Sequence, residues 1–263
     1  GVRMSEMSDY TNEIEIRFFG QRRSGHHAIM NWVYHHFSGP SSYINEIGRI
    51  REISPNSYYK NASEEQIEKD RKGDFFRKEC LILNVEDGNL QTASQEIENS
   101  KFYPRGLSKK IVNILVLRDP YNLFASRLKK SINEGTPEVW WIGPGSVRTW
   151  IQHAREFMNK TNLLGEGLVA VSYNHWFTDI DYRKGISHKL GLEFVDDGFL
   201  MVPSHGGGSS FDGTSQDRSA NSMRVLERWQ EFRGVERYEE IFENEELVRL
   251  SREIFGGIRE LSE

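Results

Sequence analysis

A strand–loop–helix pattern near the start of the chain constrains its fold more than any other feature. The segment from Ile14 to Phe37 reads IEIRFFGQRRSGHHAIMNWVYHHF. It opens with a short apolar run that predicts a β-strand, and its later apolar residues recur at roughly helical spacing. Between them lies a loop of basic and polar residues, bounded by Gly20 and Gly25. This order is typical of an α/β protein that binds an anion where the helix begins.

The loop is a candidate anion site because its backbone N–H groups and the first unpaired N–H groups of the helix point at one spot. Arg22, Arg23, His26 and His27 add side-chain donors there, and a phosphate or sulfate is the expected ligand. The alternative is a plain glycine-containing turn, with its histidines on a solvated first turn of the helix.

The glycine spacing also fits the G-x-x-x-x-G of the nucleotide P-loop, but His26 and His27 replace the Lys-[Ser/Thr] that follows it. In a P-loop that lysine reaches the outer phosphates and the hydroxyl ligates magnesium. The sequence therefore disfavours an ordinary ATPase or kinase.

The composition is that of a rather polar globular protein. The 263 residues are 37% hydrophobic, 28% charged and 12% aromatic, which is enough to bury a core and too aromatic for a disordered chain. We expect one α/β domain over residues 1–263. The formal net charge is -5, so any anion has to be held by a local basic cluster, and we expect no nucleic-acid partner.

Cysteine usage and hydropathy point to a cytoplasmic protein without a membrane partner. Cys80 is the only cysteine, which excludes an intramolecular disulfide and a cysteine-based zinc site. No run approaches the 18 or so apolar residues of a membrane span, and the N-terminal segment lacks the apolar region of a signal peptide.

Two polar segments interrupt the apolar pattern. Residues 41–77 predict an insertion or lid with short helices, one of them capped at Ser63. Residues 204–219 are rich in Gly and Ser and predict a loop. Neither segment carries a catalytic motif.

The run CLILNV, from Cys80 to Val85, predicts a buried strand of a parallel sheet. Glu86 and Asp87 follow it, at the edge where open α/β sheets bind ligands. The alternative for these two carboxylates is a helix cap and turn.

A second strongly apolar run, IVNILVL, predicts a central strand that ends at Arg118. Asp119-Pro120 fits a helix start, and Ser126 lies eight residues after Arg118, on the polar side of that helix. The alternative is a surface pair of Arg118 with Asp119 and an ordinary helix serine.

Together the loop GQRRSGHH and the element ILVLRDPYNLFASRLKK resemble the sulfotransferases that use 3'-phosphoadenosine 5'-phosphosulfate (PAPS). In that family a first loop of the K/R-S-G-T kind cradles the 5'-phosphosulfate, and an R-[DN]-P-x-x-x-x-x-S element holds the 3'-phosphate. The resemblance assigns the donor to the first-loop residues Arg22, Arg23, Ser24, Gly25, His26 and His27 and to the second-element residues Arg118 and Ser126.

Two later parts of the chain agree with the resemblance less fully. The run LVAVSY ends at Tyr173, like a family strand whose tyrosine lies near the adenine, although the family's Tyr-Glu is Tyr173-Asn174 here. The family's basic loop that closes over the nucleotide has no R-K-G counterpart, and His205, Arg218 and Arg224 are weak candidates for it.

The resemblance implies a three-layer α/β/α fold with a central, mostly parallel sheet, like that of the P-loop NTPases. It implies transfer of a sulfuryl group from PAPS to a hydroxyl or amine of a small-molecule or carbohydrate acceptor. The acceptor and the oligomeric state are not readable from the sequence. The alternatives are a P-loop kinase or other nucleotide phosphotransferase, and a non-catalytic nucleotide-binding relative.

The expected catalytic residues are Arg23, Glu86 and His27. Arg23 stabilises the leaving phosphate, with His26 or His27 assisting. Glu86 is the expected general base, its pKa raised by partial burial, and Asp87 or a histidine is the next choice. We expect no metal ion, because adjacent histidines rarely converge on one ion.

Overall fold

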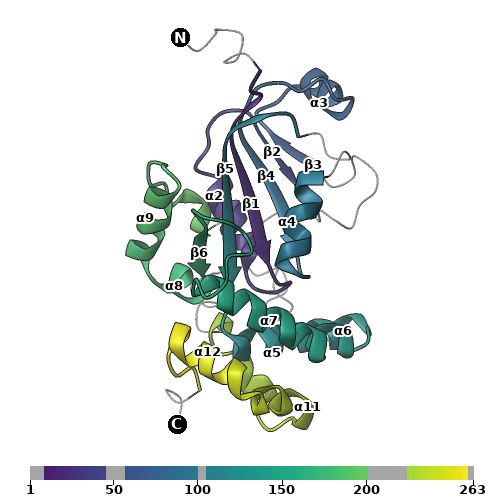
Figure 1. Cartoon of the computed structure of the whole chain (residues 1–263), viewed down its shortest axis with the longest axis vertical. Helices are drawn as coiled ribbons and strands as arrows, with labels where there is room; N and C mark the ends of the chain where they lie inside the picture. Colours follow the sequence, from purple (N-terminus) through teal and green to yellow (C-terminus); the bar gives the residue numbers. More distant parts are fainter. Residues whose placement is uncertain (1–8, 46–56, 100–104, 201–223, 260–263) are drawn as a thin grey trace.

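A six-stranded sheet forms the centre of the computed structural model, which describes residues 9–45, 57–99, 105–200 and 224–259 (Figure 1). The strand order is β3-β2-β4-β1-β5-β6, and every pairing is parallel except that of β3 with β2. The strands are β1 (Asn12–Gly20), β2 (Ser41–Ile44), β3 (Ser57–Lys60), β4 (Lys78–Glu86), β5 (Ser108–Leu117) and β6 (Val169–Ser172).

The middle strand, β1, is buried on both faces because helices cover both sides of the sheet. Phe18 and Phe19 are consecutive residues of β1, so their side chains point to opposite faces of the sheet. Phe18 packs with α2 (His26–Tyr34), α8 (Tyr173–Thr178) and α9 (Ile180–Lys189), and Phe19 packs with α4 (Leu90–Asn99). The expected three-layer α/β/α architecture is confirmed.

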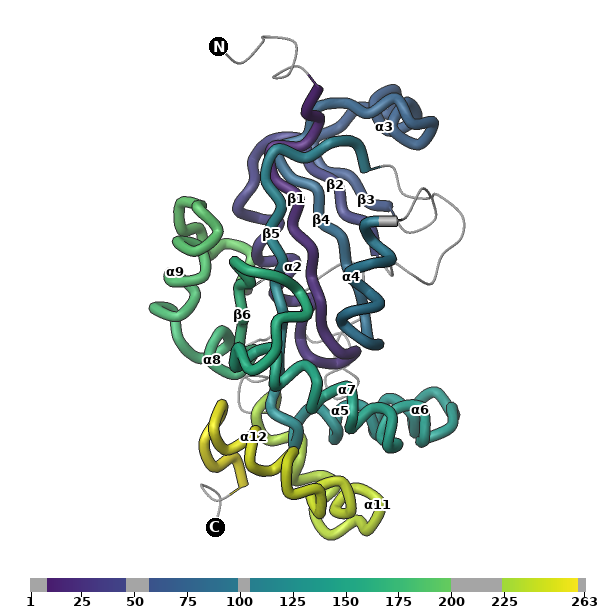
Figure 2. Tube along the Cα trace, in the orientation of Figure 1, coloured from purple at the N-terminus to yellow at the C-terminus, as the bar shows by residue number. Residues whose placement is uncertain are grey.

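A group of helices gathers beyond the carboxyl ends of the strands (Figure 2). It packs around buried Trp150 and Trp229. The group comprises α5 (Pro120–Glu134), α6 (Val139–Ile142), α7 (Pro144–Phe157), η2 (Arg228–Phe232), α11 (Glu236–Glu239), η3 (Glu240–Glu243) and α12 (Glu245–Phe255). These helices cover the carboxyl edge of the sheet, where both anion motifs lie.

The polar segment 41–77 supplies the edge strand β3 and its neighbour β2, as well as the helix α3 (Glu64–Arg71). The cap of α3 is as predicted, since Ser63 Oγ accepts the Gln66 N–H and the Gln66 side chain accepts the Ser63 N–H. The strands were not predicted, because they are four residues long and polar in sequence. The Gly/Ser-rich loop 204–219 lies outside the described residues.

The remaining short element, η1 (Asp197–Leu200), packs against α2. Within the described ranges, no helix is both long and apolar enough to span a membrane.

Burial of His153 on α7 makes the stability of the fold depend on pH. Desolvation lowers the pKa of His153 to about 4, and its Nε2 lies 3.4 Å from the carbonyl oxygen of Gly88. The unfolded chain therefore binds a proton at His153 below about pH 6.5, whereas the folded chain binds it only below about pH 4. The free energy of unfolding falls as the pH is lowered from 6.5 to about 4.

We predict that His153 alone costs about 2 kcal/mol of unfolding free energy between pH 7.5 and pH 5. Urea unfolding of His153→Gln should show a correspondingly weaker loss over this interval. Replacement of the exposed His188 by Gln is the matched control and should keep the wild-type dependence. Equal dependence in wild type and His153→Gln would contradict the assignment.

Candidate active site at the carboxyl edge of the sheet

The first loop adopts a conformation that its residues at positions 23 and 25 determine. Gly25, immediately before α2, has φ of 84°, and a Cβ there would lie 2.3 Å from ring carbons of Tyr173. Arg23 has φ of 76°, which is unusual for a residue with a side chain. Backbone strain of this kind persists where surrounding contacts hold it and is common at binding sites.

Arg127 on α5 is the main clamp on this loop. Its guanidinium is buried and donates to the carbonyl oxygens of Arg22 at 3.0 Å and of Trp141 at 2.5 Å. It also donates to Asp87 Oδ1 at 3.3 Å, and the same oxygen accepts the Arg22 N–H at 2.8 Å. Asp87 therefore takes part in holding the loop.

Arg127 was not predicted, although the sequence carries a signal for it. It follows Leu123 by four residues and Phe124 by three, so it falls on the buried face of a helix, where a charge is costly without partners.

The two predicted anion motifs meet in space. Arg23 Nε donates to Ser126 Oγ at 3.1 Å, and Arg118 donates to the carbonyl oxygen of Arg23 at 2.9 Å. The other end of the Arg118 guanidinium donates to the Val225 carbonyl oxygen at 2.6 Å. The surface-pair alternative for Arg118 is wrong, because this side chain is 5% exposed and joins the first loop to the chain near η2.

Arg23 lies among other cations. Its pKa is lowered to about 10, first by burial and then by the charges of Arg118, Arg228 and Arg22, in that order. Arg228, at the start of η2, is itself buried and was not predicted, since no motif surrounds it. Cations gathered this closely are stabilised by an anionic ligand.

Tyr173 closes one side of this cluster. Its ring lies against Gly25, and the Arg118 guanidinium carbon is 5.3 Å from its centroid. The structure thus brings Tyr173 close to both anion motifs. This position is compatible with the prediction that Tyr173 lies near the adenine.

Glu86, the last residue of β4, is a buried hydrogen-bond acceptor. Its Oε1 lies 2.6 Å from His27 Nε2, 3.1 Å from His26 Nε2 and 3.1 Å from Asn84 Nδ2, which donates to it. Its Oε2 pairs with Arg22 Nε at 3.1 Å.

The expected rise in the pKa of Glu86 is wrong. Burial alone would raise this pKa, but the hydrogen bonds and charges of His26 and His27 outweigh it and hold the pKa well below its usual range. Glu86 is therefore an ionised carboxylate that orients the two imidazoles, rather than an avid proton acceptor.

The Nδ1 atoms of the two imidazoles face hydroxyl groups. His26 Nδ1 lies 3.1 Å from Ser24 Oγ, and His27 Nδ1 lies 3.5 Å from Tyr43 Oη. The expectation that adjacent histidines do not converge is also wrong here, because both Nε2 atoms face the same carboxylate.

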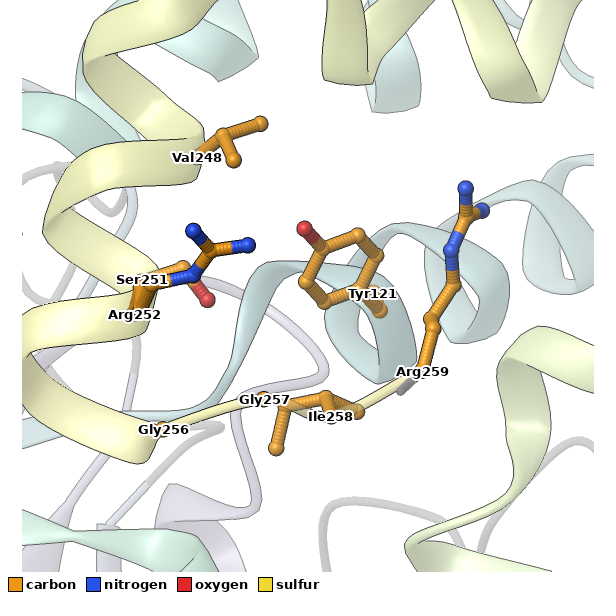
Figure 3. A pocket seen from close by; sticks show the side chains of 8 residues that line it. All are labelled: Tyr121, Val248, Ser251, Arg252, Gly256, Gly257, Ile258 and Arg259. Atoms are coloured by element: carbon orange, nitrogen blue, oxygen red, sulfur yellow. The ribbon is translucent and has the colours of Figure 1, made fainter. Parts of the chain in front are cut away.

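A separate pocket of about 220 Å³ lies between α12 and the start of α5 (Figure 3). Tyr121, Ser251, Arg252 and Arg259 are among its lining residues. None of its lining residues is one of those to which the resemblance assigns the donor, and we assign it no part in the site.

No protein-family model matches the sequence, and no curated protein matches it. Solved structures do. The sulfotransferase domain of the olefin synthase from Synechococcus PCC 7002 is 12% identical, with a TM-score of 0.51 over 93% of this chain and 96% of that chain. The mouse sulfotransferase SULT7A1 complexed with PAP is 13% identical, with a TM-score of 0.46 over 90% and 91%. The sulfotransferase domain from the curacin biosynthetic pathway is 10% identical, with a TM-score of 0.42 over 86% and 95%.

The first of these likenesses extends over nearly the whole of both chains, and it identifies the fold as that of a sulfotransferase domain. At this identity the likeness concerns the fold alone.

We predict that Gly25→Ala destabilises the protein by roughly 1–3 kcal/mol, because alanine is strained at this φ and its Cβ meets the Tyr173 ring. Sulfate should also raise the melting temperature of the variant less than that of the wild type. Gly185→Ala is the matched control, since a Cβ there meets nothing within 4 Å. Unchanged stability and sulfate response in Gly25→Ala would refute this view of the loop.

Proposed function

We propose that this chain is a sulfotransferase that moves a sulfuryl group from PAPS to a hydroxyl or amine of a small-molecule or carbohydrate acceptor. The observation that carries the proposal is the cluster in which Arg23 lies beside Arg118, Arg228 and Arg22 at the carboxyl edge of a sulfotransferase-like fold. PAPS is a matching ligand because it carries two anionic groups, the phosphosulfate and the 3'-phosphate.

The donor is assigned by the two motifs. The first loop, from Arg22 to His27, receives the phosphosulfate on its N–H groups and side chains. Arg118 and Ser126 receive the 3'-phosphate, and Tyr173 lies near the adenine. The contacts among Arg23, Arg118 and Ser126 support this arrangement, because one partly buried hydrogen-bond network links the two proposed phosphate positions.

Sulfuryl transfer is an in-line displacement. The bond from sulfur to the donor's bridging oxygen breaks while a bond to the acceptor oxygen or nitrogen forms, and the acceptor loses a proton. Arg23 stabilises the charge that develops on the leaving phosphate. With a pKa of about 10 it is still a cation at neutral pH, so it stabilises charge rather than donating a proton.

The proton acceptor is the pair formed by His27 and Glu86. When His27 Nε2–H donates to Glu86, the lone pair of the neutral imidazole is on Nδ1, where it can take the acceptor's proton. Glu86 then stabilises the imidazolium that forms. The pair refines the expectation that Glu86 acts alone, and it is supported by the 2.6 Å contact and the lowered pKa of Glu86.

We predict that 3'-phosphoadenosine 5'-phosphate (PAP) binds the wild type without magnesium and binds Arg118→Ala roughly 10- to 100-fold more weakly, through loss of charged hydrogen bonds. Isothermal titration measures both, with ATP as the comparison ligand. Arg148→Ala, on the exposed face of α7, is the matched control and should bind like the wild type. Absence of PAP binding, or a preference for magnesium-ATP, would reject the sulfotransferase assignment and favour a kinase.

We predict that His27→Ala and Glu86→Gln each lower turnover by roughly 10²- to 10⁴-fold, with a smaller effect on PAP affinity. The assay follows formation of PAP from PAPS with a panel of phenols, sugars and amines. His188→Ala should keep wild-type turnover. Near-normal turnover in His27→Ala, with PAP binding intact, would remove His27 from the mechanism.

A further inference from the structure

Three potential metal-ligating atoms converge where β4 meets the first turn of α2. The Nε2 atoms of His26 and His27 and a carboxylate oxygen of Glu86 lie within 4.8 Å of one another. The His26 and Glu86 side chains are 2% and 4% exposed, and that of His27 is 22% exposed. The group is therefore shielded from water on most sides and reachable through His27.

The donor set selects a class of metal. Two imidazole nitrogens and one carboxylate oxygen form a known set for Zn²⁺, with a fourth position left for water or an anion. Mg²⁺ prefers oxygen ligands in an octahedron and is a poor match.

The distances are close to those that zinc needs. Bonds of about 2.0–2.2 Å in a tetrahedron separate the ligand atoms by about 3.3 Å. The 3.1 Å between His26 and Glu86 is near that value, and the 2.6 Å between His27 and Glu86 has to widen. His27 is the most exposed of the three side chains, so it is the one with room to move.

The other ring nitrogens have partners that suit metal binding. A histidine that ligates through Nε2 carries its proton on Nδ1, which then needs an acceptor. Ser24 Oγ is 3.1 Å from Nδ1 of His26, and Tyr43 Oη is 3.5 Å from Nδ1 of His27. Both hydroxyl oxygens can accept such a proton.

One contact opposes a metal ion. Arg22 Nε pairs with Glu86 Oε2 at 3.1 Å, so its charge repels a cation bound to the same carboxylate. The Arg22 side chain is 35% exposed, and its guanidinium carbon also lies 5.4 Å from the centroid of the Trp141 ring. Removal of this charge should tighten metal binding.

We propose that His26, His27 and Glu86 form a Zn²⁺ site whose occupation switches off transfer. Zinc takes the Nε2 lone pair of His27, and the proton that Nε2 carried moves to Nδ1, so that the imidazole stays neutral. Nδ1 then holds a proton and has no lone pair to accept another. The metal site stands on its own geometry, whereas its inhibitory effect rests on the proposed function.

The test is competition of the protein with a chromophoric zinc indicator, using zinc chloride. The wild type and His188→Gln should each bind one zinc ion with the same affinity. His27→Gln and Glu86→Gln should bind it at least tenfold more weakly, and Arg22→Gln should bind it several-fold more tightly. Circular dichroism checks that each variant is folded. If Glu86→Gln does not fold, the zinc affinity of His27→Gln decides the test.

Wild-type zinc affinity in folded His27→Gln would overturn the proposal, as would a failure of the wild type to bind zinc. PAP titration and turnover are measured separately, with and without zinc. Turnover should fall when zinc is added and recover when EDTA removes it. If zinc binds with the expected variant pattern but PAP does not bind, the metal site stands and the proposed function fails. If conversion of PAPS to PAP is normal and zinc leaves its rate unchanged, the inhibitory role fails.

Discussion

Repulsion among arginines is the constraint around which this end of the molecule is built. Arg23 is partly buried beside the buried Arg118 and Arg228, with Arg22 nearby, and the pKa of Arg23 is lowered as a result. Backbone carbonyl groups accept several of their hydrogen bonds but do not neutralise their charge. The fold therefore maintains a concentration of positive charge in a chain whose net charge is negative. An anion with more than one charged group is the partner that such a site stabilises best.

The supports of this cluster come from distant parts of the chain. Arg127, on α5, holds the first loop through the Arg22 carbonyl oxygen. Asn122, at the start of the same helix, donates to the Leu226 carbonyl oxygen and accepts a hydrogen bond from the Trp229 N–H. The segment that contains Arg228 is thus tied to the second anion motif. The strand ends, the first loop and the helices that cover them hold one another in place. These contacts allow the strained backbone at Arg23 to persist.

Much of the architecture was predictable, because it depends on local patterns. The glycine-bounded loop between a strand and a helix, and the R-D-P element with its serine, each occupy one continuous stretch and were located from it. Arg127 acts on a residue about one hundred positions away along the chain, and Arg228 lies about two hundred positions from Arg23. No local motif encodes contacts at such separations. The direction of the Glu86 pKa shift was mispredicted for the same reason, since the histidines that lower it lie sixty residues earlier.

A crystal structure of the protein with PAP would test the central claim most directly. The account predicts one phosphate on the N–H groups of the first loop beside Arg23, and the second between Arg118 and Ser126, with the adenine near Tyr173. A ligand bound elsewhere, or with neither phosphate within hydrogen-bond distance of these arginines, would contradict the claim that the cluster is a donor site.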